Sequence, residues 1–191
     1  KTVQKIVEAS IKFKVPIISF YVFSTENWKR PKTEINYLFS LINIYFNKEI
    51  NNIIKNNIKI VTTGKLANLP SKISKILKTV INKTKKNNLL TINLAINYGS
   101  KAEIIDAIKK INYSSQKLTE KNIDKNLYSD LVFPDILVRT GGQKRLSNFM
   151  LWQLAYSEIF FLDKLWPDFT KRDLKKIINK YQKIKRNFGG I

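Results

Sequence analysis

The stretch Pro134–Asp168, PDILVRTGGQKRLSNFMLWQLAYSEIFFLDKLWPD, carries the strongest fold and site signals in the chain. It opens with the apolar run 136–138, which is short enough to be typical of a buried strand. The run ends at Arg139, and Gly141 and Gly142 then allow the backbone to turn and approach a ligand closely. This pattern predicts a strand that ends at a binding loop.

The second half of the stretch adds a helix and two charged groups. Arg145 precedes residues 149–156, which are predicted to form a helix capped by Ser147 or Asn148. Arginines beside a helix N-terminus favour an anion, especially phosphate. Glu158 follows the helix and could bring a carboxylate to a divalent metal. The stretch therefore predicts a site for a phosphate group and a metal.

Composition excludes several kinds of chemistry. The chain has 191 residues, of which 43% are hydrophobic, enough for one domain with a sizeable core. It contains no Cys and no His, which excludes disulfides, thiolate nucleophiles, His-ligated zinc and imidazole acid–base catalysis within it. No apolar run reaches the ~18 residues of a membrane span.

The net charge of +21 raises the question of nucleic-acid binding. The positive residues are mostly lysines that are spread along the chain among Asn and Ile, as in 55–59 and 83–88. This distribution is typical of lysines on solvated faces. Arginine is scarce, so each arginine indicates a need for its planar guanidinium.

The order of elements predicts an α/β single domain with a central, mostly parallel β-sheet flanked by helices on both faces. The expected strands are 17–23, 58–61, 89–96, 136–138 and 159–161. The expected helices are 2–13, 33–55 with Thr33 as a possible cap, 71–86, 102–111, a short one near 119, 149–156, and 170–185 with Thr170 and Asp173 as a capping box. Residues 187–191 are expected to be loop.

The helix expected at 33–55 carries a wide apolar stripe. Its members are Ile35, Leu38, Phe39, Ile42, Phe46, Ile50 and Ile53. The stripe fits a core-facing surface, and it could also line an apolar tunnel.

Several long motifs together resemble the cis-prenyltransferases, in particular the bacterial undecaprenyl diphosphate synthases. These motifs are FSTENWKRP at 23–31, NYG at 97–99, DILVRTGG at 135–142, RLSNF at 145–149, LWQ at 151–153, YSE at 156–158, LWPDF at 165–169 and FGG at 188–190. They cover essentially the whole chain in order.

The resemblance implies condensation of isopentenyl diphosphate onto an allylic diphosphate primer, usually farnesyl diphosphate. The implied product is a long-chain polyprenyl diphosphate such as undecaprenyl diphosphate, the lipid carrier precursor of cell-wall synthesis. It also implies that Arg139, Arg145 and Ser147 hold the diphosphate of isopentenyl diphosphate, beside the backbone of Leu146. Glu158 would be a ligand of Mg²⁺, which is usually held by hard oxygen ligands together with substrate phosphates.

A second wall of the site is implied by the first motif. Its residues would be Ser24, Thr25, Glu26, Asn27, Trp28 and Arg30. The resemblance assigns Asn27 to the proton-removal step. Because a neutral amide is a poor base, we interpret Asn27 as an orienting or relay group, with the released diphosphate as final proton acceptor.

The resemblance further implies a homodimer in the cytoplasm, with peripheral contact to the inner face of the membrane as a hypothesis and no nucleic-acid partner. Two departures from the family pattern stand out. The Asp-Gly-Asn-Gly-Arg-Trp segment and the first strand are expected upstream of Lys1, so this chain is expected to be truncated and impaired alone. Gln143 replaces a common glutamate, which is expected to tune diphosphate binding.

Three alternatives stay open at this point. A trans-type prenyltransferase needs DDxxD motifs, which the sequence lacks. A non-catalytic subunit of a heteromeric cis-prenyltransferase would be expected to lose the 24–30 segment, which is present. A nucleic-acid-binding protein would rest on charge alone and predicts a clustered basic stripe with stacking aromatic residues.

Overall fold

The computed structural model describes residues 1–185 and has an α/β fold in which all paired strands are parallel. The chain divides into two compact units. The large unit comprises Val15–Val132 and Asn148–Trp152, and the small unit comprises Lys1–Lys14, Phe133–Ser147 and Gln153–Ile191.

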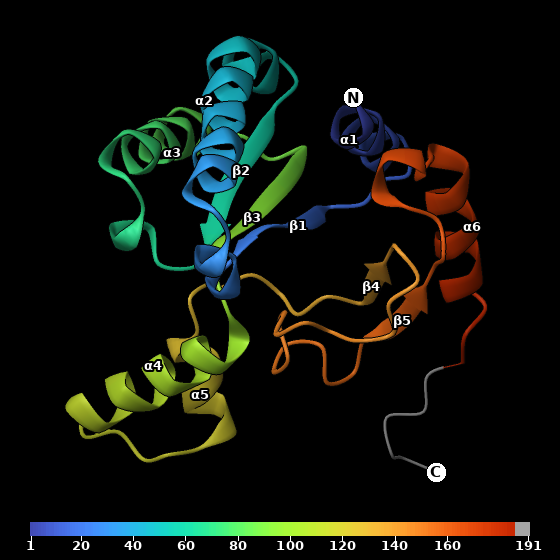
Figure 1. The fold of residues 1–191 in the computed structure, drawn as a ribbon. Helices are drawn as coiled ribbons and strands as arrows, with labels where there is room; N and C mark the ends of the chain where they lie inside the picture. The colour runs from blue at the N-terminus through green and yellow to red at the C-terminus, as the bar shows by residue number, and fades with distance from the viewer. Residues whose placement is uncertain (186–191) are drawn as a thin grey trace. The chain divides into compact units, whose positions relative to one another are not determined.

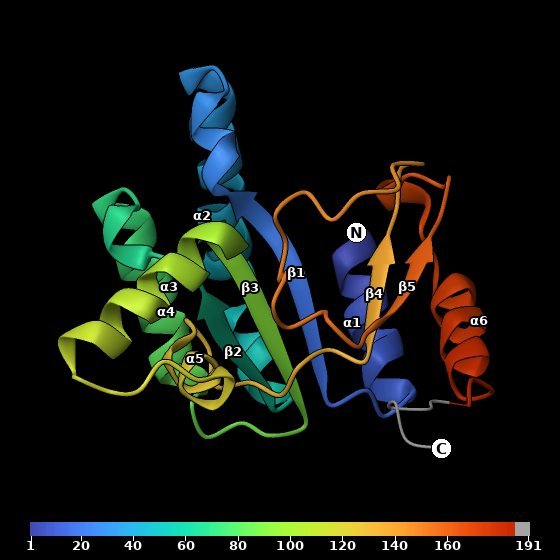
Figure 2. The same cartoon turned by 90° about the horizontal axis from the view of Figure 1, so that it is seen from below.

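The large unit is built on a three-stranded parallel sheet in the order β1-β3-β2 (Figures 1 and 2). Helices α2 and α3 lie side by side, and α4 lies beside α5 (Figure 1). Its elements are β1 (Ile17–Ser24), the 3-10 helix η1 (Thr25–Lys29), α2 (Lys32–Lys55), β2 (Ile58–Thr63), the 3-10 helix η2 (Leu66–Asn68), α3 (Ser71–Thr84), β3 (Leu90–Tyr98), α4 (Ser100–Tyr113) and α5 (Glu120–Asn126).

Strand β3 is the central strand of this sheet and is buried along almost its whole length. Seven of its nine residues are buried, which is typical of a parallel strand covered on both faces. The register pairs Ile18 of β1 and Ile60 of β2 with Ile92 of β3. The carboxyl ends of β1 and β3 meet at Ser24 and Tyr98, so the segments that follow these strands lie at one edge of the sheet.

The described part of the small unit contains a two-stranded parallel sheet, two α-helices and one 3-10 helix. Its elements are α1 (Thr2–Lys12), β4 (Ile136–Arg139), β5 (Glu158–Phe161), the 3-10 helix η3 (Trp166–Asp168) and α6 (Lys171–Tyr181). Figure 2 shows β4 and β5 side by side, and Ile136 pairs with Glu158. Helices α1 and α6 pack together (Figure 1), and a capping box of Thr170 and Asp173 starts α6 as the sequence predicts.

The structure confirms the prediction of parallel strands flanked by helices, and it divides the strands between two sheets. The predicted cap of the long helix is wrong: α2 begins at Lys32 with Pro31 as its N-cap, so Thr33 lies inside the helix. On α2 the stripe alternates between buried residues, Ile35, Phe39, Phe46 and Ile53, and half-buried ones. The stretch 187–191 and the FGG motif at 188–190 lie outside the described residues.

The predicted helix 149–156 is also wrong, because this segment is a series of turns. Ser147, Asn148 and Met150 have φ angles of 51°, 61° and 44°, in the left-handed region that interrupts a right-handed helix. Phe149 and Met150 are nevertheless buried, so the apolar pattern reflects packing and not helical periodicity. The anion site predicted beside 139–147 therefore has no helix N-terminus.

Candidate active site

Segment η1 begins where β1 ends and is fixed by its own side chains. The backbone N–H of Ser24 donates to Asn27 Oδ1 at 2.9 Å, and the Ser24 side chain accepts from the Asn27 backbone, which completes a capping box. The amide oxygen of Asn27 is thus engaged within η1. Its NH₂ group has no hydrogen bond to any described residue, so it remains available to donate.

Glu26 lies on the exposed side of η1 and accepts a hydrogen bond from a residue far away in the sequence. Asn148 Nδ2 donates to Glu26 Oε1 at 2.7 Å. Burial raises the pKa of Glu26, but hydrogen bonds from Asn148 and from Ser24 and Thr25 outweigh that effect, so the net pKa lies below its usual value. Glu26 is therefore an anion at neutral pH and a poor proton donor.

Trp28 is the apolar anchor of η1. Its ring packs edge-on against Phe23 and is tilted against Phe39, with centroid distances of 5.1 and 5.8 Å. Its Nε1–H donates to Asn97 Oδ1 at 2.8 Å. Trp28 is nevertheless 40% exposed, so its ring can contact a ligand while its ring contacts and its hydrogen bond to Asn97 hold it in place.

Arg30 follows η1 and pairs with Glu34 in the first turn of α2. The distance between Arg30 Nη1 and Glu34 Oε1 is 2.6 Å, and both side chains are nearly half exposed. An exposed pair of this kind contributes little to stability. The guanidinium can therefore exchange this carboxylate for a phosphate group at low cost.

A cavity of about 430 Å³ opens behind η1 within the large unit. Thr25 and Trp28 line it on the side of η1, and Lys65, Asn97 and Tyr128 line it from other elements. Gly99 also lines this cavity, and it packs so closely on η1 that an added Cβ would lie 2.4 Å from Thr25 Oγ1. The cavity shows that the predicted wall residues Thr25 and Trp28 face open space.

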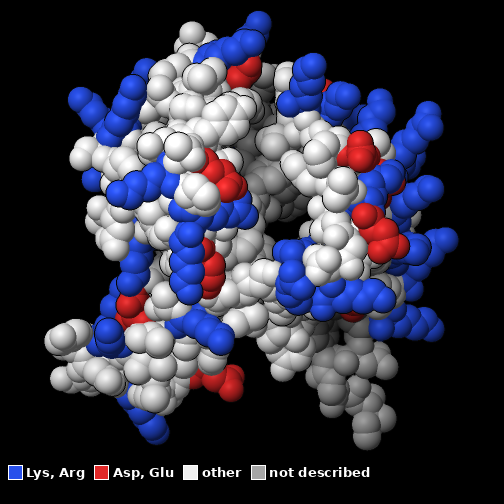
Figure 3. All heavy atoms as spheres, viewed as in Figure 1, with Lys and Arg blue, Asp and Glu red and all other residues white. Residues whose placement is uncertain are grey.

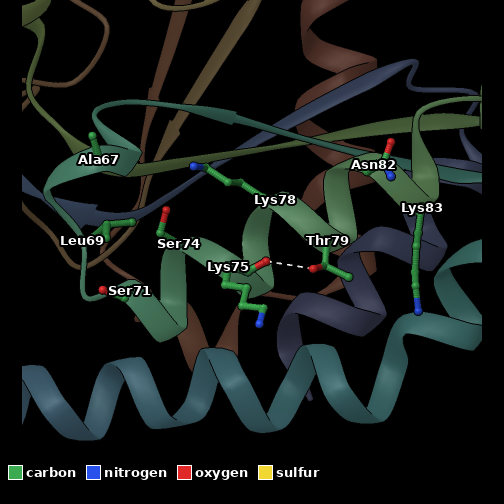
Figure 4. Close-up of a pocket in the computed structure, with 9 residues that line it drawn as sticks. All are labelled: Ala67, Leu69, Ser71, Ser74, Lys75, Lys78, Thr79, Asn82 and Lys83. Carbon is green, nitrogen blue, oxygen red and sulfur yellow. Dashed lines mark hydrogen bonds between the residues drawn. The ribbon is translucent and has the colours of Figure 1, made fainter.

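A larger hollow of about 750 Å³ lies on α3 and does not contain any predicted site residue (Figure 4). It is lined by Ala67, Leu69, Ser71, Ser74, Lys75, Lys78, Thr79, Asn82 and Lys83. Figure 4 shows that Lys78 points to the opposite side from Lys75 and Lys83, so these ammonium groups do not converge on one anion.

In the small unit, Arg139 is the last residue of β4 and is half-buried. Its Nε is fully buried and has no hydrogen-bond partner among the described residues. Gly141 and Gly142, with φ of 87° and 71°, donate their backbone N–H groups to Lys164 and Leu162 at 2.9 Å each. The loop is thus pinned beside β5, and a guanidinium donor at its start lacks an acceptor.

Arg145 is exposed in the same loop and donates from Nη1 to Gln143 Oε1 at 2.7 Å. A glutamate at 143 would neutralise this guanidinium, whereas glutamine leaves its full charge. Leu146 is half-buried and Ser147 is exposed. The segment therefore presents a second full cation, although its backbone forms turns and not the predicted helix start.

Glu158 begins β5, where its backbone N–H donates to Asp135 O at 2.9 Å. Its side chain is half-buried. Within residues 1–185 no group of three or more acidic residues could hold a metal by itself. The donor set fits Mg²⁺ only where phosphate oxygens of a substrate complete the coordination, which is how Mg²⁺ is commonly held.

The structure adds two site residues that sequence reasoning did not assign. Asn97 contacts Trp28 and Asn148 contacts Glu26, across 69 and 122 positions of sequence. Asn97 lies in the NYG motif and Asn148 in the RLSNF motif, but nothing local in either motif indicates these partners.

Comparison with known proteins places the whole chain in one family. Residues 1–189 match the family described as "Putative undecaprenyl diphosphate synthase". The isoprenyl transferase of Fusobacterium nucleatum is 41% identical and that of Halalkalibacterium halodurans 44%, each over 100% of this chain and over 84% and 78% of those proteins. A crystal structure of a probable undecaprenyl diphosphate synthase from Campylobacter jejuni has a TM-score of 0.91 and 40% identity, covering 98% of this chain and 90% of that one.

These matches disfavour the alternatives left open by the sequence. The similarity to isoprenyl transferases extends over the entire length and includes the η1 segment. On the face shown in Figure 3, basic side chains are scattered among acidic and uncharged ones and do not form a single stripe. The chain belongs to the undecaprenyl diphosphate synthase family and is an isoprenyl transferase of the cis-prenyltransferase type.

Proposed function

We propose that the protein condenses isopentenyl diphosphate onto an allylic diphosphate primer, with farnesyl diphosphate as the expected primer and a long-chain polyprenyl diphosphate as product. The observation that carries this proposal is the buried, unpartnered Nε of Arg139 at the end of β4. A buried guanidinium donor without an acceptor is costly, and a diphosphate oxygen would satisfy it.

The loop after β4 supplies the other groups for the diphosphate of isopentenyl diphosphate. Arg145 adds a second guanidinium, whose hydrogen-bond partner among the described residues is the neutral Gln143. Ser147 adds a hydroxyl, and the backbone of Leu146 lies between them in sequence. Two planar forks bind a multiply charged anion bidentately, which favours phosphate over a singly charged group.

Segment η1 serves the reacting end of the substrates. With its amide oxygen held by Ser24, Asn27 donates from its NH₂ group and orients a substrate oxygen. It is not a base, so the proton lost on forming the new double bond passes to the released diphosphate. Thr25 and the face of Trp28 line the adjoining cavity, and Arg30 and Glu26 set the charge at this wall.

Glu158 is the proposed protein ligand of Mg²⁺, together with diphosphate oxygens. Bound there, the metal would neutralise charge on the diphosphate and so favour its departure from the allylic carbon. The partly buried stripe of α2 is the proposed apolar surface for the growing chain, since it alternates between buried and half-buried residues.

We further propose a homodimer that acts in the cytoplasm and touches the membrane peripherally. No helix among residues 1–185 is long and apolar enough to span a bilayer. Helix α2 exposes Tyr37, Leu41 and Ile44, a surface that could enter a lipid interface beside the many lysines. Sedimentation with anionic liposomes tests the contact, and light scattering of the purified protein tests the dimer.

The function is tested with Arg139→Gln, which removes the guanidinium and its charge and leaves a shorter, neutral polar side chain. We expect KM for isopentenyl diphosphate to rise by ~30-fold or more, because a charge-assisted bidentate contact is lost. Arg172→Gln on the exposed face of α6 removes the same charge elsewhere and should leave KM unchanged. Equal KM values for the two variants would contradict the assignment of Arg139.

A further inference from the structure

Two asparagines of the large unit that lie outside η1 hydrogen-bond to the residues that precede and follow Asn27 in the sequence. We propose that Asn97 and Asn148 are positioning residues for the reaction, which keep the amide of Asn27 in its working place. This inference rests on the proposed role of η1. Neither residue is proposed to touch substrate.

Asn97 is the penultimate residue of β3 and has a backbone conformation that few residues adopt. Its φ is 49°, in the left-handed region where asparagine is favoured, and only 4% of it is exposed. Both ends of its amide are used: Oδ1 accepts from Trp28 Nε1 at 2.8 Å, and Nδ2 donates to Lys65 O at 2.8 Å. A residue here must therefore tolerate positive φ, donate and accept, which together specify asparagine.

Asn148 meets the same three requirements. Its φ is 61°. Its Nδ2 donates to Glu26 Oε1 at 2.7 Å, and its Oδ1 accepts from the backbone N–H of Lys101 at 2.9 Å. Its own carbonyl accepts from the N–H of Ser100 at 2.9 Å. Asn148 thus ties Glu26 to the first turn of α4, which provides a rigid anchor.

These contacts hold the residues immediately before and after Asn27. Glu26 precedes Asn27 and Trp28 follows it, so η1 cannot shift without breaking a long-range hydrogen bond. Gly99 permits the close approach, since a Cβ there would lie 2.4 Å from Thr25 Oγ1 and 2.8 Å from Asn148 Nδ2. A misplacement of a catalytic group by ~1 Å can lower a rate by ~100-fold.

The first test compares Asn148→Asp with Asn148→Ala in the complete gene product. Aspartate keeps the acceptor for Lys101 but places a second carboxylate against Glu26, so it should be the more damaging change. We expect kcat to fall by ~10- to 100-fold in Asn148→Asp, with KM for isopentenyl diphosphate nearly unchanged. Aspartate that performs better than alanine would overturn the inference for Asn148.

The second test is a double-mutant cycle between Asn97→Ala and Trp28→Phe. Phenylalanine removes the indole N–H and leaves the turn untouched, so it remains informative if Asn97→Ala folds poorly. If both changes act through one hydrogen bond, the double variant should lose no more kcat than the more impaired single variant. Fully additive losses would overturn the inference for Asn97.

A matched control and a spectroscopic measurement separate positioning from stability. Asn87 donates its side-chain N–H to Ile58 O at 2.7 Å at the opposite end of the sheet, so Asn87→Ala should lower stability without lowering kcat. The indole N–H of Trp28 should exchange slowly with solvent in the unmodified protein and faster in Asn97→Ala. Unchanged exchange would overturn the assigned contact whatever the activity.

The outcomes also distinguish this inference from the function on which it rests. An unmodified protein that incorporates no isopentenyl diphosphate would overturn the proposed function and this inference with it. An active protein whose Asn97 and Asn148 variants keep kcat within about twofold would overturn the inference alone.

Discussion

Replacing Tyr98 by phenylalanine should destabilise the large unit strongly, although it removes a single oxygen. The Tyr98 hydroxyl donates to Glu103 Oε2 at 2.6 Å, and both residues are 0% exposed. Burial, and then the charge of Glu103, raise the pKa of Tyr98 far above its usual value, so the hydroxyl remains a donor at neutral pH. The other oxygen of Glu103 accepts from the backbone N–H of Tyr128 at 2.9 Å.

The expected loss follows from the charge on the acceptor. A hydrogen bond to a charged group contributes ~1.5–3 kcal/mol. The ring contacts of Tyr98 with Tyr21 and Phe149 survive in phenylalanine. We therefore expect Tyr98→Phe to lower the free energy of unfolding by ~2–3 kcal/mol.

The assay is urea unfolding followed by far-UV circular dichroism. Tyr113→Phe is the matched control, because Tyr113 is 91% exposed and should change the free energy by less than ~0.5 kcal/mol. A cycle with Glu103→Gln should give a coupling of at least ~1 kcal/mol. A Tyr98→Phe protein within ~0.5 kcal/mol of the unmodified protein would refute this account of the buried pair.

Three further predictions concern backbone geometry and pH. Gly64 has φ of 127°, and a Cβ there would lie 2.1 Å from a carbonyl oxygen of β3, so Gly64→Ala should cost ~2–4 kcal/mol in urea unfolding; a neutral effect would contradict the close approach. Burial and nearby carboxylates raise the pKa values of Tyr98 and Tyr128, so above about pH 10 only the unfolded chain loses these protons. The urea midpoint should therefore fall above about pH 10, and it should fall less steeply in Tyr98→Phe. Hydrogen bonds, first from Lys164, lower the pKa of Asp173 to about 2, so Asp173→Asn should be less stable than the unmodified protein above about pH 4 and equally stable as the pH falls toward 2. A stability difference between the two proteins that does not change with pH would contradict the contact.

The regular elements could be predicted from the sequence because their patterns are local. Among the described residues, apolar patterns identified the five strands and the six α-helices to within a few residues, and Thr170 and Asp173 marked the start of α6. The failure at 149–156 has a local cause that the pattern hides. Left-handed φ angles at Ser147, Asn148 and Met150 allow apolar side chains to be buried from successive turns.

The candidate site was predictable only in part. Arg139 was identified because it ends a strand and precedes two glycines, which is a local signal. The link from Trp28 to Asn97 was not, because it joins the ends of two strands that are brought together by the sheet. The buried state of the Arg139 Nε likewise depends on tertiary packing, which no sequence window contains.

The most direct test of the central claim is incorporation of labelled isopentenyl diphosphate onto farnesyl diphosphate by the complete gene product, with and without Mg²⁺. The account predicts Mg²⁺-dependent extension into polyprenyl products, with Arg139→Gln requiring a higher concentration of isopentenyl diphosphate and Arg172→Gln behaving as the unmodified protein. A folded protein that forms no extended product, or one whose product formation is indifferent to Arg139, would contradict it.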